Sequence, residues 1–154
     1  MDLSTVALDD LVNGYERVND TYCCLFCEAA YEEQQVYALG EQFFTAQGMI
    51  NRHIYEVHHS PFDALLALDK KVTGLSDVQM EMMRHFYEGA PDKEIVAASS
   101  VTSVSTVRQH RFKLREKEKQ AKVFLALMQL LKSPVHDAIH KGAKQVDERY
   151  STTT

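Results

Sequence analysis

The 154-residue sequence predicts a mainly α-helical protein, with a small ββα unit followed by a helical domain that ends in a long helix. Three observations predict this class. Apolar residues recur at helical spacing along much of residues 75–131. Within residues 21–60, two cysteines and two histidines flank a glycine-centred hairpin pattern. The apolar fraction of 45% favours a folded core over extended disorder.

Residues 1–20 are expected to form an N-terminal amphipathic helix. Leu8, Leu11, Val12 and Tyr15 share one helical face there. The segment is acidic and lacks the basic start and apolar run of a signal peptide. No stretch of the sequence approaches the roughly 18 apolar residues of a membrane span. We therefore expect a cytoplasmic protein that does not enter a membrane, in which cysteines are not a disulfide framework.

Residues 21–60 contain a Cys-x2-Cys pair, Cys24 and Cys27, and a His-x4-His pair, His53 and His58. Two thiolates at this spacing can face one tetrahedral zinc ion from a tight turn, and the two histidines lie on roughly one helix face. Between the pairs, apolar residues flank Gly40 as in a β-hairpin, namely Val36, Tyr37, Leu39, Phe43 and Phe44. The segment thus predicts a zinc-finger-like ββα unit with a structural Zn²⁺.

Alternatives for these cysteines stay open. Cys23 and His59 are spare ligands beside the expected four. A redox dithiol requires a lowered thiol pKa, which the acidic residues following Cys27 disfavour. A catalytic zinc requires a nearby general base, and Glu56 is not part of a His-Glu-x-x-His array. Buried thiols without a metal are the remaining possibility. Because neither a redox dithiol nor a catalytic zinc is favoured, we expect no enzymatic activity.

Residues 61–74 are expected to form a connecting helix or linker. Pro61 begins this segment, and its apolar residues fall at helical spacing at Phe62, Leu65, Leu66 and Leu68. Thr73-Gly74 is the predicted domain boundary.

Residues 75–133 predict two short helices, a tight turn and a third helix. The first carries apolar Val78, Met82, Phe86 and Tyr87 and ends near Gly89 as C-cap. Asp92 is expected to cap the second, which carries Ile95, Val96 and Ala98. A Ser/Thr/Val turn leads to a helix that begins near Ser103 and runs through Val107 and Leu114. This order is that of a helix-turn-helix domain whose third helix fits a major groove.

The segments Leu75-Ser76, Asp92-Lys-Glu-Ile95 and Ser105-Thr-Val-Arg-Gln-His110 resemble the LuxR-type, or GerE-type, helix-turn-helix. The resemblance covers about a quarter of the chain, and ten residues separate Ile95 from Thr106 where the family usually has nine. The continuation after His110 resembles a group of Firmicute transcriptional regulators that share an N-terminal Cys-x-x-Cys segment. In that group a glycine follows the His-x4-His pair, at the position of His59, which favours His58 as the ligand.

Each expected DNA contact has a chemical reason. Val107 and Leu114, seven residues apart, should anchor the third helix. Base edges are assigned to Arg108, Gln109 and Phe112, because arginine suits guanine, glutamine suits adenine and a phenyl ring suits the thymine methyl group. The resemblance supports Arg108 and Gln109. Phosphates are assigned to Ser103, Ser105 and Thr106 at the helix N-terminus, and to the basic side chains of Arg111, Lys113 and Arg115.

Charge is divided unevenly along the chain, whose formal net charge is −5. Residues 1–60 contain ten acidic and two basic residues, whereas residues 103–122 contain seven basic and two acidic ones. Because salt screens charges beyond about 8–10 Å, the local field of a docking face matters more than net charge. The basic segment can therefore bind DNA; a solvated, salt-bridged helix is the alternative.

The third helix continues into an apolar stripe formed by Ala121, Phe124, Leu125, Met128 and Leu131, and Ser133-Pro134 should end it. Such a stripe can pack on the chain's own helices or form a two-helix seam between subunits. We expect a homodimer, because two reading helices then meet a palindromic site. The C-terminal tail, residues 134–154, contains His136 and His140, which we interpret as an exposed helix face rather than a metal site.

The sequence thus predicts a dimeric, sequence-specific transcriptional regulator that binds double-stranded DNA through a helix-turn-helix and contains a structural zinc. The alternative is a protein-interaction module with a degenerate helix-turn-helix that binds a partner such as RNA polymerase or a sigma factor.

Overall fold

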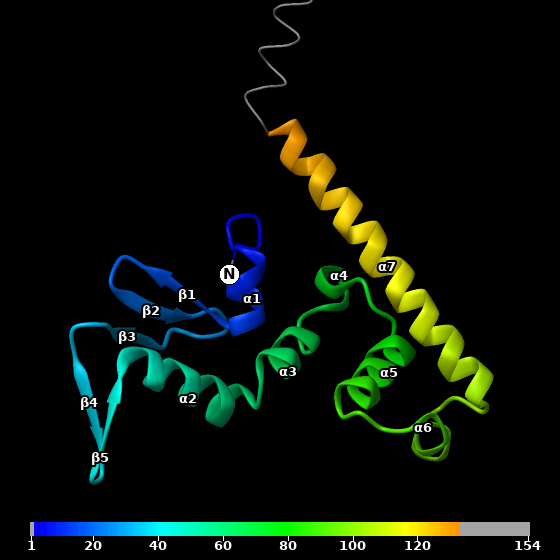
Figure 1. The fold of residues 1–154 in the computed structure, drawn as a ribbon, viewed down its shortest axis with the longest axis horizontal. Coiled ribbons are helices and arrows are strands. Elements are labelled where there is room, and N and C mark those ends of the chain that lie inside the picture. Colours follow the sequence, from blue (N-terminus) through cyan, green and yellow to red (C-terminus); the bar gives the residue numbers. More distant parts are fainter. Residues whose placement is uncertain (1, 133–154) are drawn as a thin grey trace, which may run out of the picture. The chain divides into compact units, whose positions relative to one another are not determined.

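The computed structural model describes residues 2–132. Within the described residues, the chain divides after Ser76 into two compact units (Figure 1). Each unit has a core of its own. Helices predominate, and a small antiparallel sheet lies near the N-terminus. None of the helices in the described part combines the length and apolarity required to cross a membrane.

The first unit begins with helix α1 (Leu8–Asn13) and a three-stranded antiparallel sheet. Its strands β1 (Tyr15–Val18), β2 (Thr21–Cys24) and β3 (Ala30–Glu32) pair in the order β1-β2-β3. Gly14 joins α1 to β1 in the left-handed conformation, with φ of 82°. The expected helix over residues 1–20 is therefore confirmed only over Leu8–Asn13. The sequence leaves the helix at Gly14, and Tyr15 lies in a strand paired with Cys24.

A hairpin and a long helix complete the frame of this unit. Strands β4 (Val36–Leu39) and β5 (Gln42–Thr45) form the hairpin around Gly40, as the sequence predicts. Helix α2 (Ala46–His58) follows directly, and the Thr45 side chain caps it by accepting a hydrogen bond from the Gly48 amide. α2 packs on β2 and β3 through fully buried Ile50 and Ile54.

Helices α3 (Pro61–Leu66) and α4 (Lys70–Thr73) end the first unit. Buried Ser60 caps α3 by accepting a hydrogen bond from the Asp63 amide at 3.0 Å. α3 packs against α1 and α2, so residues 61–66 form a helix that belongs to the first unit. The boundary between the units follows Ser76, close to the predicted Thr73-Gly74.

The second unit consists of helices α5 (Asp77–Tyr87), α6 (Asp92–Ala98) and α7 (Val104–Leu131) over the described residues. Their shared core contains Met82, Ile95, Val101 and Val107, with half-buried Val78, Phe86, Ala90 and Val96 around it. Gly89, with φ of 72°, ends α5 as the sequence predicts. Tyr87 and Ala98, also expected on apolar helix faces, are exposed.

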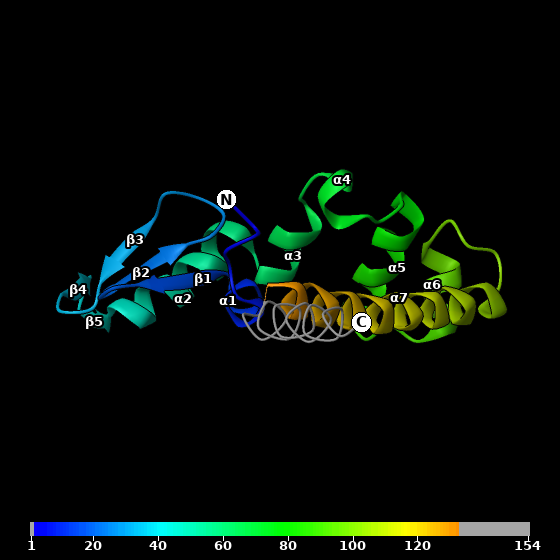
Figure 2. The same ribbon diagram turned by 90° about the horizontal axis from the view of Figure 1, so that it is seen from above.

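Helix α7 is one continuous helix of 28 residues. Figures 1 and 2 show that α5 and α6 lie along its N-terminal part and leave its C-terminal part without a helical neighbour from the described residues of this unit. The expected cap at Asp92 is wrong by one residue. Pro91 is the N-cap of α6, and Asp92 is its first helical residue with its side chain engaged elsewhere. The segment containing His136 and His140 lies outside the described residues.

Candidate metal centre and basic helix face

The turn between β2 and β3 positions both cysteines of the Cys-x2-Cys pair. Cys24 ends β2, and its amide donates to the Ala29 carbonyl at 2.8 Å, which closes the turn around Cys27. The Phe26 amide donates to Cys24 Sγ at 3.4 Å. Such an amide donor stabilises negative charge on sulfur and so lowers the pKa of Cys24, against the larger opposite effect of burial.

Helix α2 brings the two histidines to this turn. His58 Nε2 lies 3.5 Å from Cys24 Sγ, and His53 Nε2 lies 3.1 Å from Cys27 Sγ. The four ligand atoms all lie within 4.8 Å of one another. The sequence prediction that these four residues come together is therefore confirmed, although 25 residues separate the two pairs.

The four side chains could hold a metal ion. Tetrahedral zinc bonds of about 2.3 Å to sulfur and about 2.0 Å to nitrogen give sulfur–nitrogen separations of about 3.5 Å. The two observed sulfur–nitrogen distances, 3.5 and 3.1 Å, lie near that value. Two thiols with two imidazoles also form the soft donor set of closed structural sites.

Burial shifts the ionisation of this cluster. Burial raises the pKa of the Cys24 thiol, and the nearby Cys27 thiol raises it further. Burial also lowers the pKa of His53, with a smaller contribution from the charge of His58. Imidazole binds metal in its neutral form, so His53 is ready to coordinate, whereas Cys24 must lose a proton when a metal binds.

The spare ligands lie outside the cluster. Cys23 precedes Cys24 in β2, and consecutive strand residues point to opposite faces; its Sγ lies 4.0 Å from the Thr21 carbonyl. His59 is exposed and has a left-handed φ of 65° immediately after α2. This conformation explains why a glycine would suit the position. Glu56 pairs with Arg52 at 2.7 Å on the exposed side of α2.

Aromatic rings surround the two imidazoles, a feature that the sequence analysis missed. The Phe26 ring packs edge-on against the His58 ring, with 5.4 Å between the ring centres. The ring centres of Tyr31 and His53 are 6.3 Å apart. The two imidazoles are 5.2 Å apart. Phe26 lies inside the Cys-x2-Cys pair and Tyr31 soon after it, so their aromatic character was the available signal. These rings limit the orientations of the ligands.

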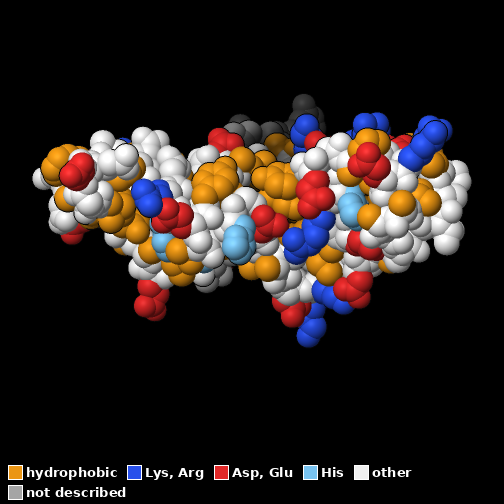
Figure 3. Space-filling view, turned by 90° about the horizontal axis from the view of Figure 1, so that it is seen from below, with side chains coloured by type: hydrophobic (Ala, Val, Ile, Leu, Met, Phe, Trp, Pro, Cys, Tyr) orange, Lys and Arg blue, Asp and Glu red, His pale blue; other side chains and the backbone are white. Residues whose placement is uncertain are grey.

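Helix α7 carries most of the expected nucleic-acid contacts on its exposed side. Val107 is fully buried and Leu114 is half-buried. The structure exposes six of the expected residues. At about 100° per residue, three of them face away from Val107 and Leu114, namely Ser105, Gln109 and Phe112, and three lie on the flanks, namely Arg108, Lys113 and Arg115. We call these six residues the α7 outer face. Figure 3 shows basic side chains over the second unit, towards the right of the view.

Two of the residues expected at phosphates have hydrogen-bond partners inside the unit. Ser103 is the N-cap of α7, where its Oγ accepts from the Thr106 amide at 3.2 Å and lies 2.8 Å from Thr106 Oγ1. Arg111 donates to Asp92 Oδ1 at 2.6 Å, and its guanidinium lies 4.1 Å from the Phe86 ring centre. Arg111 therefore links all three helices rather than pointing outward.

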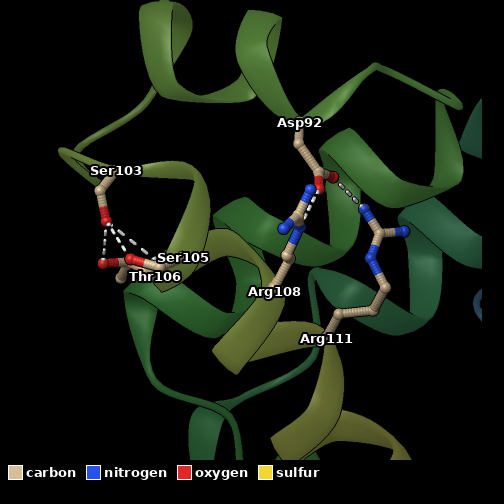
Figure 4. Close-up of polar contacts among 6 residues, drawn as sticks. All are labelled: Asp92, Ser103, Ser105, Thr106, Arg108 and Arg111. Carbon is tan, nitrogen blue, oxygen red and sulfur yellow. Dashed lines mark hydrogen bonds and ion pairs between the residues drawn. The ribbon is translucent and has the colours of Figure 1, made fainter.

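Arg108 shares the same carboxylate. Its Nε lies 3.4 Å from Asp92 Oδ2, so two arginines of α7 converge on one acidic side chain of α6 (Figure 4). The Arg108 side chain nevertheless stays 74% exposed, compared with 37% for Arg111. The sequence analysis missed this role of Asp92, because it placed the residue at the cap of α6.

Comparison with protein-family models, curated proteins and solved structures finds no match for this chain.

Proposed function

We propose that this protein is a sequence-specific regulator that binds double-stranded DNA, with α6 and α7 as a helix-turn-helix and α7 as the reading helix. The α7 outer face is the observation that carries the proposal. It is exposed along the first turns of α7, while Val107 on the opposite side is fully buried in the core with α5 and α6. A helix supported in this way by two shorter helices can enter a major groove.

The side chains of the α7 outer face suit base and backbone contacts. Arg108 can donate two hydrogen bonds to guanine O6 and N7, and Gln109 can bind the adenine edge. Phe112, 62% exposed, can meet a thymine methyl group. Exposed Lys113 and Arg115 can contact phosphates on either side of these base contacts, whereas Arg111 is hydrogen-bonded to Asp92 within the unit. This division favours Lys113 and Arg115 over Arg111 as backbone contacts.

The metal in the first unit is proposed to be a structural Zn²⁺. Cys24, Cys27, His53 and His58 would hold it, which completes four-coordination from the protein and leaves no position for substrate. The nearby acidic Glu56 pairs with Arg52. A zinc ion here would join the β2–β3 turn to α2 and so stabilise a unit with a small core.

A second copy of the chain is the proposed partner of the C-terminal half of α7. Its apolar side chains are each more than half exposed, namely Val123, Phe124, Leu125, Leu127, Leu130 and Leu131. Pairing two such helices would cover the side chains on one face, which include Val123, Leu127 and Leu130, and would bring two reading helices to one palindromic site. Sedimentation of the wild type and of Phe124→Glu tests this seam. We expect a dimer that becomes monomeric in the variant.

The first experiment selects duplexes from a random pool and measures their binding by fluorescence anisotropy over a salt series. Arg108→Ala should weaken binding to the selected duplex by about 1–3 kcal/mol and relax the protein's sequence preference. Lys113→Ala should weaken all duplexes alike and reduce the salt slope by about one. Arg17→Ala, which removes a positive charge from the first unit, is the control. Unchanged affinity in both α7 variants would refute the proposal.

The exposed stripe of α7 also favours a second candidate function, a module that binds another protein through that stripe. In this case binding of a partner such as RNA polymerase survives Arg108→Ala and is lost in Phe124→Glu. Selection that enriches no duplex, together with weak salt-sensitive binding, would favour this alternative.

A further inference from the structure

We propose that Asp92 is a positioning residue that holds Arg108 for guanine recognition and so determines specificity. The inference rests on the proposed DNA-binding function. Asp92 opens α6 directly against α7, and its side chain is only 25% exposed between two guanidinium groups. Its two carboxylate oxygens are divided between the two arginines (Figure 4).

The two arginines are held to different degrees. Arg111 has a short contact of 2.6 Å to Oδ1 and lies over the Phe86 ring, so its position is fixed within the core side of the unit. Arg108 meets Oδ2 through Nε, at 3.4 Å. This contact leaves the Nη side of the guanidinium open, and the side chain remains 74% exposed.

This one-sided contact suits guanine. An arginine guanidinium has five N–H donors in a rigid plane, so a carboxylate at Nε leaves the two Nη groups to donate to O6 and N7 of one base. Adenine has an amino group where guanine has O6, and this amino group donates a hydrogen bond and cannot accept one from arginine. Holding the long side chain beforehand also reduces the conformational entropy lost on binding.

The charge of Asp92 gives the proposal a distinctive signature. A carboxylate close to DNA repels phosphates, and here two guanidinium groups offset it. Removing its charge should therefore strengthen or preserve binding to unrelated duplexes while it weakens discrimination for guanine. Simple loss of structure would weaken both the binding to unrelated duplexes and the discrimination for guanine. Stronger or equal binding to unrelated duplexes with weaker discrimination therefore indicates that Asp92 positions Arg108.

The test compares wild-type protein with Asp92→Asn on the selected duplex, in which each guanine is replaced in turn by 7-deazaguanine. In the wild type, loss of N7 at one position should weaken binding about tenfold, as expected for a bidentate contact. In Asp92→Asn the same replacement should cost less than about threefold, with unrelated duplexes bound at least as well. Arg111→Lys, which keeps Asp92 beside Arg108, is the matched control and should retain the wild-type penalty.

A second measurement addresses the wild-type chain itself and does not depend on the folding of any variant. The Nε–H group of Arg108, followed by ¹⁵N relaxation in the protein without DNA, should be less ordered than that of Arg111, which has the shorter contact. It should still be more ordered than that of exposed Arg115. An Arg108 Nε–H as mobile as that of Arg115 would overturn the proposal.

The DNA-binding measurements distinguish failure of the Asp92 role from failure of the proposed DNA-binding function. Wild-type protein without salt-dependent DNA binding would overturn both. Wild-type protein that binds a selected duplex with an equal 7-deazaguanine penalty in Asp92→Asn would overturn the role of Asp92 alone. That role is also overturned if Arg111→Lys loses the penalty as fully as Asp92→Asn.

Discussion

At the scale of single residues, neighbours of the same type have different roles. Cys23 and Cys24 are adjacent in β2, but only Cys24 joins the cluster with Cys27. Arg108 and Arg111, nearly one helical turn apart, meet the same carboxylate, yet one stays exposed and the other lies over Phe86. Strand alternation and helical phase, rather than residue type, assign these roles.

The adjacent cysteines therefore provide a matched pair of variants. Cys24→Ala should weaken zinc binding by at least about 100-fold, because it removes a ligand where loss of a supporting residue alone costs about 10–100-fold. Cys23→Ala should retain one zinc per chain. Elemental analysis with a competing chelator measures both. Equal zinc content in the two variants would contradict the assigned ligand set.

Arg111→Ala should destabilise the second unit. The variant loses a hydrogen bond to Asp92 and the contact over the Phe86 ring, which together should cost about 1–3 kcal/mol. Arg115→Ala, at an exposed position of the same helix, should change stability by less than about 0.5 kcal/mol. Urea denaturation followed by helical circular dichroism gives both values, and equal stabilities would show that Arg111 does not link the helices.

At the scale of elements, glycines mark positions where the chain leaves a helix or reverses direction between strands. Gly14 ends α1 with φ of 82°, and its buried position brings Phe26 and Ile54 close. Gly40 has φ of 61° at the hairpin tip, with open space around it. Both need a left-handed backbone, but only Gly14 also needs the absence of a side chain.

Gly14→Ala should therefore cost more stability than Gly40→Ala. A Cβ atom at Gly14 would lie 3.1 Å from Phe26 Cε2 and 3.2 Å from Ile54 Cδ1. We expect about 2–4 kcal/mol for this variant, from left-handed strain and crowding together, and about 1 kcal/mol for Gly40→Ala, from strain alone. Thermal unfolding of the zinc-loaded protein compares them. A larger loss for Gly40→Ala would contradict the packing around Gly14.

How far the sequence predicts each element depends on the strength of its local pattern. The hairpin around Gly40 and the C-cap at Gly89 follow from strong local patterns and are confirmed. The strands β1 to β3 are only three or four residues long, and the turns that join them contain no glycine to mark them in the sequence. The contact between Asp92 and the α7 arginines is tertiary, since Arg111 lies 19 positions after Asp92 in another helix.

At the scale of the whole molecule, the chain contains two cores of different kinds. The core of the first unit includes Cys24, one of the four residues that could hold a metal ion, together with Ile50 and Ile54. The core of the second unit is apolar, with Met82, Ile95 and Val107 fully buried, and contains no metal-site residue among those described. Loss of zinc should therefore act on one core only.

Removal of zinc by a strong chelator should unfold the first unit and leave the second folded. Structural zinc contributes an apparent free energy of about 10–16 kcal/mol in zinc-finger peptides, about the whole stability of a small domain. Hydrogen exchange read by mass spectrometry should show α2 peptides losing protection while α5 and α6 peptides keep theirs. DNA affinity should change by less than about threefold, because the α7 outer face depends on the second core. Zinc re-addition should restore α2, and loss of protection in α5 and α6 together with α2 would mean that the two cores fold as one.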